Sequence, residues 1–278
     1  MKFCGLVYSS DLDNFFTLKE KDKLIYFYLQ RNLAKKFSKY LQNGVFISID
    51  VEDEKSLHKG INCYVVSHFL EISNRKYGDN KIYYSINSFR DGIKDLLDNL
   101  NNTVFIDFEF NMQDFYPINN FVSEIIEAGY CVCDPNLNVI EERSMYLLPT
   151  KVKKITKRTI KFLKYKESQM KNRLSYKEFY FSFKNLVKKY DPHFIVWGKS
   201  DIDLLKQSFQ INKVPPINFK FIDLSQIHVN YYNLKNVPGL FKTAEAYNNV
   251  ELPKQKHDAL EDALMTKLVF SNFKETIK

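Results

Sequence analysis

Two carboxylates inside a strongly apolar strand, residues 103–110, constrain the fold of this chain more than any other feature of its sequence. The segment reads Thr-Val-Phe-Ile-Asp-Phe-Glu-Phe, in which five of eight residues are Val, Ile or Phe, as is typical of a buried central strand. Strand alternation places Asp107 and Glu109 together on one face, where they repel each other, and desolvation strengthens that repulsion. A solvent-facing edge or a bound divalent cation would relieve it, and the apolar character of the strand favours the cation.

A second informative segment, residues 194–205, combines a buried strand, a glycine turn at Gly198 and a helix that begins near Asp201. Taken alone, Asp201 is typical of a helix N-terminus, where its carboxylate can accept backbone N–H bonds. The segment by itself therefore leaves a structural and a chemical role open.

A third segment, His257-Asp258-Ala259-Leu260-Glu261-Asp262, lies at the start of the last expected helix. On a continuous helix His257 and Asp262 would lie about 140° apart, so they share a site only if His257 precedes the first turn. The preceding Pro253 favours that placement. A solvated helix start, with Asp258 and Glu261 complementing the helix dipole, is the alternative.

Taken together and in this order, the strand Asp-x-Glu, the strand-Gly-x-x-Asp and the His-x-Ala-x-x-Asp resemble the DEDDh, or DnaQ-like, 3′-5′ exonuclease superfamily. The resemblance covers residues 103–273 and implies an RNase H-like fold. It implies that Asp107, Glu109, Asp201 and Asp262 hold two Mg²⁺ or Mn²⁺ ions and that His257 is the general base. Oxygen ligands suit these hard cations, and the unperturbed pKa of histidine suits proton transfer near neutral pH.

Two positions qualify this resemblance. Asp203 competes with Asp201 for the third acid, but the spacing from Gly198 favours Asp201, and Asp203 is more typical of a first-turn helix acid. The family usually has a small or hydroxyl residue after the motif glutamate, whereas this chain has Phe110, which bears on how the terminal nucleotide is held.

The Trp197-Gly198-x-x-Asp201 pattern is most similar to the subgroup that trims RNA 3′ ends, so we expect a single-stranded RNA 3′ end as substrate in preference to DNA. The alternatives are a DNA exonuclease of proofreading or repair, and a non-catalytic nucleic-acid-binding or regulatory protein on the same fold. Retention of all four acids and the histidine argues against the non-catalytic alternative.

A run of basic residues follows the third expected strand, with no acid before Glu167. Such a run is usually a solvated face, but beside an exonuclease cleft it is equally typical of a phosphate track. The run consists of Lys151, Lys153, Lys154, Lys157, Arg158, Lys161, Lys164 and Lys166. From it and from the motif strand we select Lys157, Arg158, Phe108 and Phe110 as candidate nucleic-acid contacts.

The chain is expected to have two parts. Residues 103–278 alternate between strands and helices, which predicts an α/β domain with a mixed sheet and helices on both faces. Residues 1–87 read as strands around one helix, which predicts a small β-rich domain, either an OB-type nucleic-acid-binding module or another fold. Among its aromatics, Tyr8, Phe16, Tyr26 and Tyr28 could stack on bases or pack in the core. Residues 88–102 are expected to form a connecting helix.

Composition bears on the charge of the partner, the cellular location and the role of the cysteines. A net charge of +8 and a pI near 9.0 favour a polyanionic partner without requiring one. No apolar run approaches the roughly 18 residues of a membrane span, and the start at Met1 has no signal-peptide pattern, so we expect a cytoplasmic protein. The four cysteines exclude a disulfide scaffold, and Cys131 and Cys133 are expected to be ordinary buried residues on one strand face.

Overall fold

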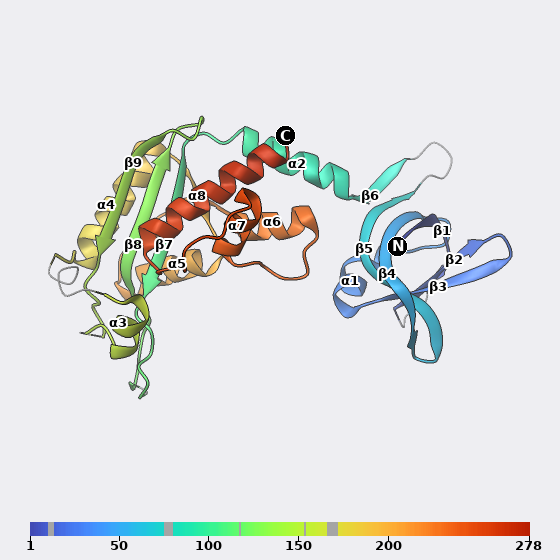
Figure 1. Cartoon of the computed structure of the whole chain (residues 1–278), viewed down its shortest axis with the longest axis horizontal. Coiled ribbons are helices and arrows are strands. Elements are labelled where there is room, and N and C mark those ends of the chain that lie inside the picture. The colour runs from blue at the N-terminus through green and yellow to red at the C-terminus, as the bar shows by residue number, and fades with distance from the viewer. Residues whose placement is uncertain (11–13, 75–79, 117, 153, 166–171) are drawn as a thin grey trace. The chain divides into compact units, whose positions relative to one another are not determined.

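The computed structural model describes the whole chain except residues 11–13, 75–79, 117, 153 and 166–171. Lys153 and Lys166 of the basic run therefore lie outside the described residues. The chain divides into two compact units, Met1–Ile93 and Lys94–Lys278. Figure 1 shows the elements of both units.

The first unit contains a closed barrel of five strands. The barrel closes because β3 pairs in parallel with β5, while β1 pairs with both β2 and β4, and β4 pairs with β5. A helix lies between the third and fourth strands, so the connectivity is consistent with the OB-type alternative. The elements are β1 (Lys2–Ser10), β2 (Phe15–Glu20), β3 (Lys23–Leu29), α1 (Arg31–Phe37), the 3₁₀ turn η1 (Ser38–Tyr40), β4 (Phe46–His58), β5 (Ile61–Asn74) and β6 (Lys81–Ser85).

Apolar alternation explains how this barrel fills its interior. The alternating apolar residues of β4 and its flank are buried, and the neighbouring strands add large side chains such as Phe16 and Phe27, whose rings stack 5.1 Å apart between centroids. Phe16 is thereby a core residue, whereas Tyr8 and Tyr26 are exposed on the outside of the barrel. The alternating apolar residues are Val45, Ile47, Ile49 and Val51.

Helix α2 (Ile86–Asp98) follows the barrel and corresponds to the helix expected over residues 88–102. It begins two residues earlier, where the Ser85 side chain accepts a hydrogen bond from the backbone N–H of Ser88 at 3.2 Å. The division between the two units falls within α2, after Ile93.

The second unit is built on a five-stranded sheet with the order β11-β10-β7-β8-β9. β7 is the central strand, as predicted, and it pairs in parallel with β10 and antiparallel with β8. All nine residues of β8 are buried. The strands are β7 (Thr103–Phe110), β8 (Ile125–Cys133), β9 (Val139–Tyr146), β10 (His193–Val196) and β11 (Lys220–Asp223).

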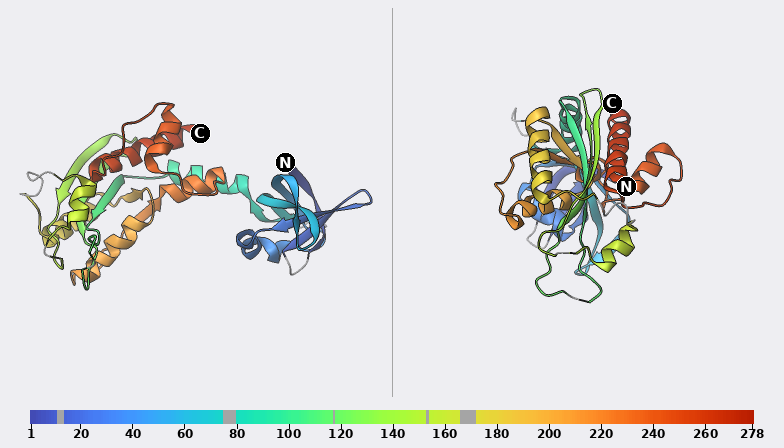
Figure 2. Two further views of the ribbon diagram at one scale, coloured as in Figure 1. Left: turned by 60° about the horizontal axis from the view of Figure 1, so that its bottom comes forward. Right: turned by 90° about the vertical axis from the view of Figure 1, so that its left-hand side faces the viewer.

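Helices cover both faces of this sheet, which confirms the predicted mixed α/β architecture. Figure 2 shows the sheet edge-on, with α4 on one side and α8 on the other. On the α4 side, Phe108 packs against Phe179 of α4, and on the α8 side the ring of Phe105 lies 5.3 Å from that of Phe270. Three helices were not anticipated: α3, α6 and α7. The helices are α3 (Lys157–Leu163), α4 (Tyr176–Tyr190), α5 (Ser200–Ile211), α6 (Leu224–Tyr232), α7 (Leu240–Asn248) and α8 (Ala259–Thr276).

Gly129 on β8 permits a close approach that fixes the start of α8. A Cβ built on this glycine would overlap the backbone of Ala259 and Leu260, the first residues of the helix. Only glycine lets the helix backbone lie directly on the strand at this point. The first turn of α8 is therefore held against β8, next to the central strand β7.

Candidate active site

The two acids of β7 lie on the side of the sheet that α8 covers. Alternation turns Phe105, Asp107 and Glu109 to this side and Phe108 to the opposite core. Both acids are largely enclosed, in agreement with the sequence analysis, which placed them together on one face of a central strand.

Asp201 joins them from the first turn of α5. Gly198 adopts a φ of +111°, which turns the chain from β10 into the helix, and its N–H donates to Asp223 Oδ1 at 3.1 Å. The helix N-cap is Lys199, so Asp201 is not the capping residue that the segment suggests in isolation. The Asp201 side chain is buried instead, and this burial raises its pKa, while a hydrogen bond from the backbone N–H of Phe108 on β7 opposes part of the rise.

Asp203 occupies a different environment, which supports the choice of Asp201. Its carboxylate is more than half exposed and forms a surface ion pair with Lys199 at 3.6 Å. Asp203 is therefore the first-turn helix acid that the spacing predicts.

Asp262 is supplied by the first turn of α8, whose N-cap is Asp258. The Asp258 side chain accepts from the backbone N–H of Glu261 at 3.0 Å, so this acid is used in capping. Asp262 is buried, and its Oδ2 accepts from Gln255 Nε2 at 2.6 Å. The close contact of α8 with Gly129 brings Asp262 to the acids of β7.

The four carboxylates disturb one another strongly. Burial, followed by the charges of Asp201, Asp262 and Glu109, raises the pKa of Asp107 well above its usual value. Burial and the charge of Asp262 raise the pKa of Glu109 to about 9. Burial is also the largest cause that raises the pKa values of Asp201 and Asp262, each to about 6. The arrangement is unfavourable for the protein alone, as expected of a site for positive charge.

His257 precedes the helix, as the sequence analysis required. Its φ of +58° lies in the left-handed region, and the imidazole lies 4.5 Å from the Phe162 ring between centroids. Burial lowers the pKa of His257. One ligand atom from each of His257, Glu109 and Asp262 lies within 4.8 Å of the others.

A divalent cation fits these residues. Asp262 Oδ1 is buried and has no hydrogen-bond partner among the residues that the structure describes. A buried carboxylate oxygen without a donor is costly, and a cation would satisfy it while reversing the repulsion in the cluster. The donors are mainly carboxylate oxygens, which hard divalent cations prefer.

One more acid lies near this cluster, Glu127 on β8, which belongs to none of the three sequence motifs. It is fully buried and pairs in register with Glu109 across the sheet. Tyr165 Oη donates to Glu127 Oε2 at 2.7 Å, and burial raises the pKa of Glu127 to about 7. The signal in the sequence was a single glutamate in an otherwise apolar segment, but its register with Glu109 could not be read there.

The candidate nucleic-acid contacts separate in the structure. The side chain of Phe108 is 3% exposed and packs in the α4-side core, because alternation turns it away from the acids. This position excludes the contact with nucleic acid expected of its ring. Phe110 is half-buried against the same core. Lys157 and Arg158 are both exposed in α3, but only Arg158 lines the pocket beside His257.

That pocket has a volume of about 480 Å³ and is lined by basic and aromatic side chains together with His257. Among the described residues, its lining contains no acid. Residues of α3 and residues 254–257 both line it, and local sequence patterns could not predict that these two segments lie together. Its basic and aromatic members are Arg158, Lys161, Lys164, Lys254, Lys256, Phe115 and Phe162.

Buried polar side chains fix the segment that leads into α3. The Glu124 carboxylate accepts from the backbone N–H groups of Thr150, Lys151 and Val152 at 2.7–3.0 Å. Asn111 Oδ1 accepts from the Thr156 N–H at 3.0 Å. The basic segment beside the pocket is therefore attached to the ends of β7 and β8.

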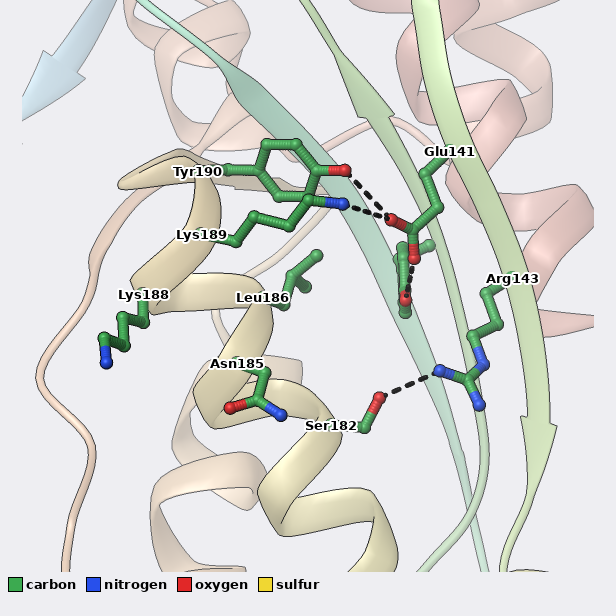
Figure 3. A pocket seen from close by; sticks show the side chains of 9 residues that line it. Glu141, Arg143, Ser182, Asn185, Leu186, Lys188, Lys189 and Tyr190 are labelled. Carbon is green, nitrogen blue, oxygen red and sulfur yellow. Dashed lines mark hydrogen bonds and ion pairs between the residues drawn. The ribbon is translucent and has the colours of Figure 1, made fainter.

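A second cavity, of about 520 Å³, lies on the other side of the sheet between β9 and α4 (Figure 3). Glu141 projects into it and accepts from Tyr130 Oη at 2.8 Å and from Tyr190 Oη at 3.0 Å. Arg143 donates to Ser182 at 3.1 Å. These polar groups satisfy one another and lie on the face opposite the acid cluster.

Together, a mixed sheet with helices on both faces and four converging acids at its centre define a nuclease-like site. Comparison with known proteins agrees. The RNase T exonuclease family model matches residues 104–270. The probable 3′-5′ exonuclease KapD of Bacillus subtilis (strain 168) is 36% identical over 172 residues, which cover 61% of this chain and 83% of KapD.

Solved structures share the fold at lower identity. The nuclease domain of 3′hExo, described as a DEDDh family member bound to rAMP, matches with a TM-score of 0.54 and 18% identity, covering 64% of this chain and 94% of that one. A 3′-exonuclease in a structure of histone mRNA stem-loop recognition matches with a TM-score of 0.53 and 19% identity, covering 63% of this chain and 83% of that one.

The chain therefore belongs to the RNase T exonuclease family, within the DEDDh 3′-5′ exonuclease superfamily, as the three sequence motifs predict. Members of this family are hydrolases that use divalent metal ions. Among the described residues, no helix combines the length and apolar character needed to cross a membrane.

Proposed function

We propose that this protein is a two-metal-ion exonuclease that removes nucleotides from a single-stranded 3′ end, RNA in preference to DNA. One observation carries the proposal: three distant chain segments bring four acids with raised pKa values to one place, beside an unpartnered Asp262 oxygen. Asp107, Glu109, Asp201 and Asp262 are the proposed ligands of two Mg²⁺ or Mn²⁺ ions.

Bound ions of this kind supply activation of a water molecule and stabilisation of the leaving 3′ oxygen in phosphodiester hydrolysis. The chain contributes the base. Burial lowers the pKa of His257, so its imidazole is neutral near pH 7 and a ring nitrogen can accept the proton of the attacking water. Phe162 packs against the imidazole and limits its movement.

The pocket beside His257 is the proposed path of the substrate strand. Its cations, among them Arg158, Lys161 and Lys254, can contact phosphates, and Phe162 offers an exposed ring on which a base can stack. A single strand fits this combination because its bases are free to stack. Lys157 does not line the pocket and is a weaker candidate.

The preference for RNA rests on similarity. The Trp197-Gly198-x-x-Asp201 pattern is most similar to the RNA-trimming subgroup. In support, one of the two solved relatives compared above is bound to rAMP, and the other is described in a structure of histone mRNA stem-loop recognition. DNA is the alternative substrate, and the experiment described below distinguishes it from RNA.

We also propose that the barrel of the first unit binds single-stranded nucleic acid on its outer surface. Tyr28 is partly exposed there and stacks on His58, with ring centroids 4.3 Å apart and planes 11° apart. Tyr26 is exposed on the same strand, and Lys19 lies 5.8 Å from the centre of the exposed Tyr8 ring. Aromatic rings with nearby cations are suited to stacked bases and phosphates. Tyr26→Ala should weaken binding of a labelled RNA to the full chain, whereas Leu57→Ala, another exposed barrel position, should not.

The decisive experiment uses a matched pair of 5′-labelled single strands, one RNA and one DNA, with Mn²⁺ or EDTA. We expect a metal-dependent ladder that shortens from the 3′ end, faster on RNA, and its loss in His257→Ala. Faster shortening of DNA would reverse the substrate preference. No shortening of either strand would contradict the exonuclease proposal.

A Mn²⁺ titration of the same variant separates a base from a ligand. If His257 is the base, His257→Ala loses activity but binds Mn²⁺ nearly as well as the wild type. If the variant loses affinity as strongly as Glu109→Gln does, His257 is a metal ligand, as its distance to Glu109 and Asp262 also allows.

A further inference from the structure

Glu127 is a buried carboxylate with one satisfied and one unsatisfied oxygen. Its Oε2 accepts from Tyr165 Oη at 2.7 Å, whereas Oε1 has no hydrogen-bond partner among the described residues. The backbone of Ala259 and the side chain of Tyr146 also lie close enough to this carboxyl to act to lower its pKa. An unpaired buried oxygen is costly, and more so when the group is charged. Native structures seldom retain such a group without a reason, so Oε1 points to a partner that is not part of the protein.

The position of Glu127 indicates where this partner lies. Glu127 is the antiparallel register partner of Glu109, so the two side chains leave neighbouring strands on the same face. Its charge is also among the causes that raise the pKa values of Asp107 and Glu109. Glu127 therefore lies close to acids of the proposed ion site, and also to Asp258, whose charge helps to raise the pKa of Glu127.

Glu127 stands outside the closest set of ligand atoms. Within the described part of the chain, the group whose ligand atoms lie within 4.8 Å of one another is Glu109, His257 and Asp262. Glu127 thus lies outside this innermost group, as Asp107 and Asp201 also do, and its register with Glu109 places it beside the site. Tyr165, in the segment just after α3, holds the other carboxylate oxygen and so orients the side chain.

We propose that Glu127 is a positioning residue for the divalent ion, and that its Oε1 accepts a hydrogen bond from the hydration shell of the ion held by Glu109. This inference rests on the proposed metal-dependent function of the same site. Side chains that orient an ion or its ligands without binding the ion directly commonly change metal affinity or activity by about 10–100-fold when they are removed. The Tyr165–Glu127 pair also connects the ion site to the segment that borders the substrate pocket.

The test is a calorimetric Mn²⁺ titration of the metal-free, full-length protein. Glu127→Met removes both acceptor oxygens at similar volume, and we expect about 10–100-fold weaker Mn²⁺ binding. Glu127→Gln retains one acceptor, and Tyr165→Phe removes only the orienting hydroxyl, so both should show smaller losses. Excess Mn²⁺ should restore the exonuclease rate of Glu127→Met, whereas a defect of packing would not respond to metal.

The second cavity offers matched controls. Glu141 also accepts from tyrosine hydroxyls, but it lies on the opposite face of the sheet, so Glu141→Gln and Tyr190→Phe should bind Mn²⁺ as the wild type does. If Glu127→Met does not fold, as judged by circular dichroism, Glu127→Gln and Tyr165→Phe carry the test. Wild-type affinity in the Glu127 variants would overturn this inference alone. A wild-type protein that neither binds Mn²⁺ nor shortens nucleic acid would overturn it together with the proposed function.

Discussion

Replacement of Glu109 by glutamine should stabilise the metal-free protein, although it removes a proposed ligand of the active site. The pKa of Glu109 is raised from 4.5 to about 9, chiefly by burial and then by the charge of Asp262. The folded protein therefore binds a proton at this position that the unfolded chain has released. Stability falls as the pH rises through this window, from about 4.5 to about 9.

The size of the effect follows from the two pKa values. At pH 7.5 the pH lies three units above the pKa of 4.5 that the glutamate has in the unfolded chain. Each unit corresponds to about 1.4 kcal/mol, so Glu109 lowers the free energy of unfolding by about 4 kcal/mol relative to low pH, where both states are protonated. At pH 5 the same reasoning gives less than about 1 kcal/mol. Glutamine has nearly the same shape and does not titrate. The gain in Glu109→Gln should therefore grow from under about 1 kcal/mol at pH 5 to about 4 kcal/mol at pH 7.5.

The assay is urea unfolding in EDTA at the two pH values. Trp197 is the single tryptophan and lies in the second unit, so its fluorescence reports the unfolding of that unit. Added Mn²⁺ should narrow the difference in stability at pH 7.5, because an ion at 100 times its Kd stabilises the wild type by about 2.7 kcal/mol and the variant much less. A variant that is less stable than the wild type in EDTA at pH 7.5, or a gain independent of pH, would refute the reasoning.

Three further predictions concern the site and its surroundings. Asp107→Asn should be inactive yet no less stable than the wild type in EDTA, and a melting temperature several degrees lower would contradict the second half. Gly129→Ala should lose about 1–3 kcal/mol or more by urea unfolding, together with activity, because a Cβ there overlaps the start of α8. Gly92→Ala, in open space within α2, should instead be neutral or stabilising by up to about 1 kcal/mol. Lys161→Gln should flatten the dependence of log affinity on log salt for a single strand by about 0.7, whereas Lys188→Gln on the opposite face of the sheet should leave the slope unchanged.

Much of the site could be predicted because its residues obey local rules. The period of two along β7 determined which face receives Asp107 and Glu109, and the apolar run indicated a central strand. Gly198 and the helix after it identified Asp201 over Asp203. His257 was expected before the first turn because a continuous helix would have separated it from Asp262.

The remaining features depend on contacts between distant segments. Glu127 reaches the site through strand register, which a buried run such as β8 does not reveal. Lys254 and Lys256 share one pocket with Arg158, and this placement depends on the packing of the start of α8 against Gly129. The helix α3 was not predicted, because its sequence reads as a basic run. Thr156 caps this helix by accepting a hydrogen bond from the Thr159 N–H at 3.2 Å.

The repulsive cluster persists in the folded protein because the two faces of β7 have opposite effects on stability. Val104, Ile106 and Phe108 are buried on the α4 side, and each such side chain contributes about 1.5–3 kcal/mol when removed from water. This burial offsets the cost of holding Asp107 and Glu109 without a cation on the α8 side. A strand that stays in place without metal presents its carboxylates already arranged, so binding of an ion need not be coupled to refolding. The stability that Glu109→Gln recovers in EDTA is then the cost of this arrangement, and a variant that gains it should lose Mn²⁺ affinity.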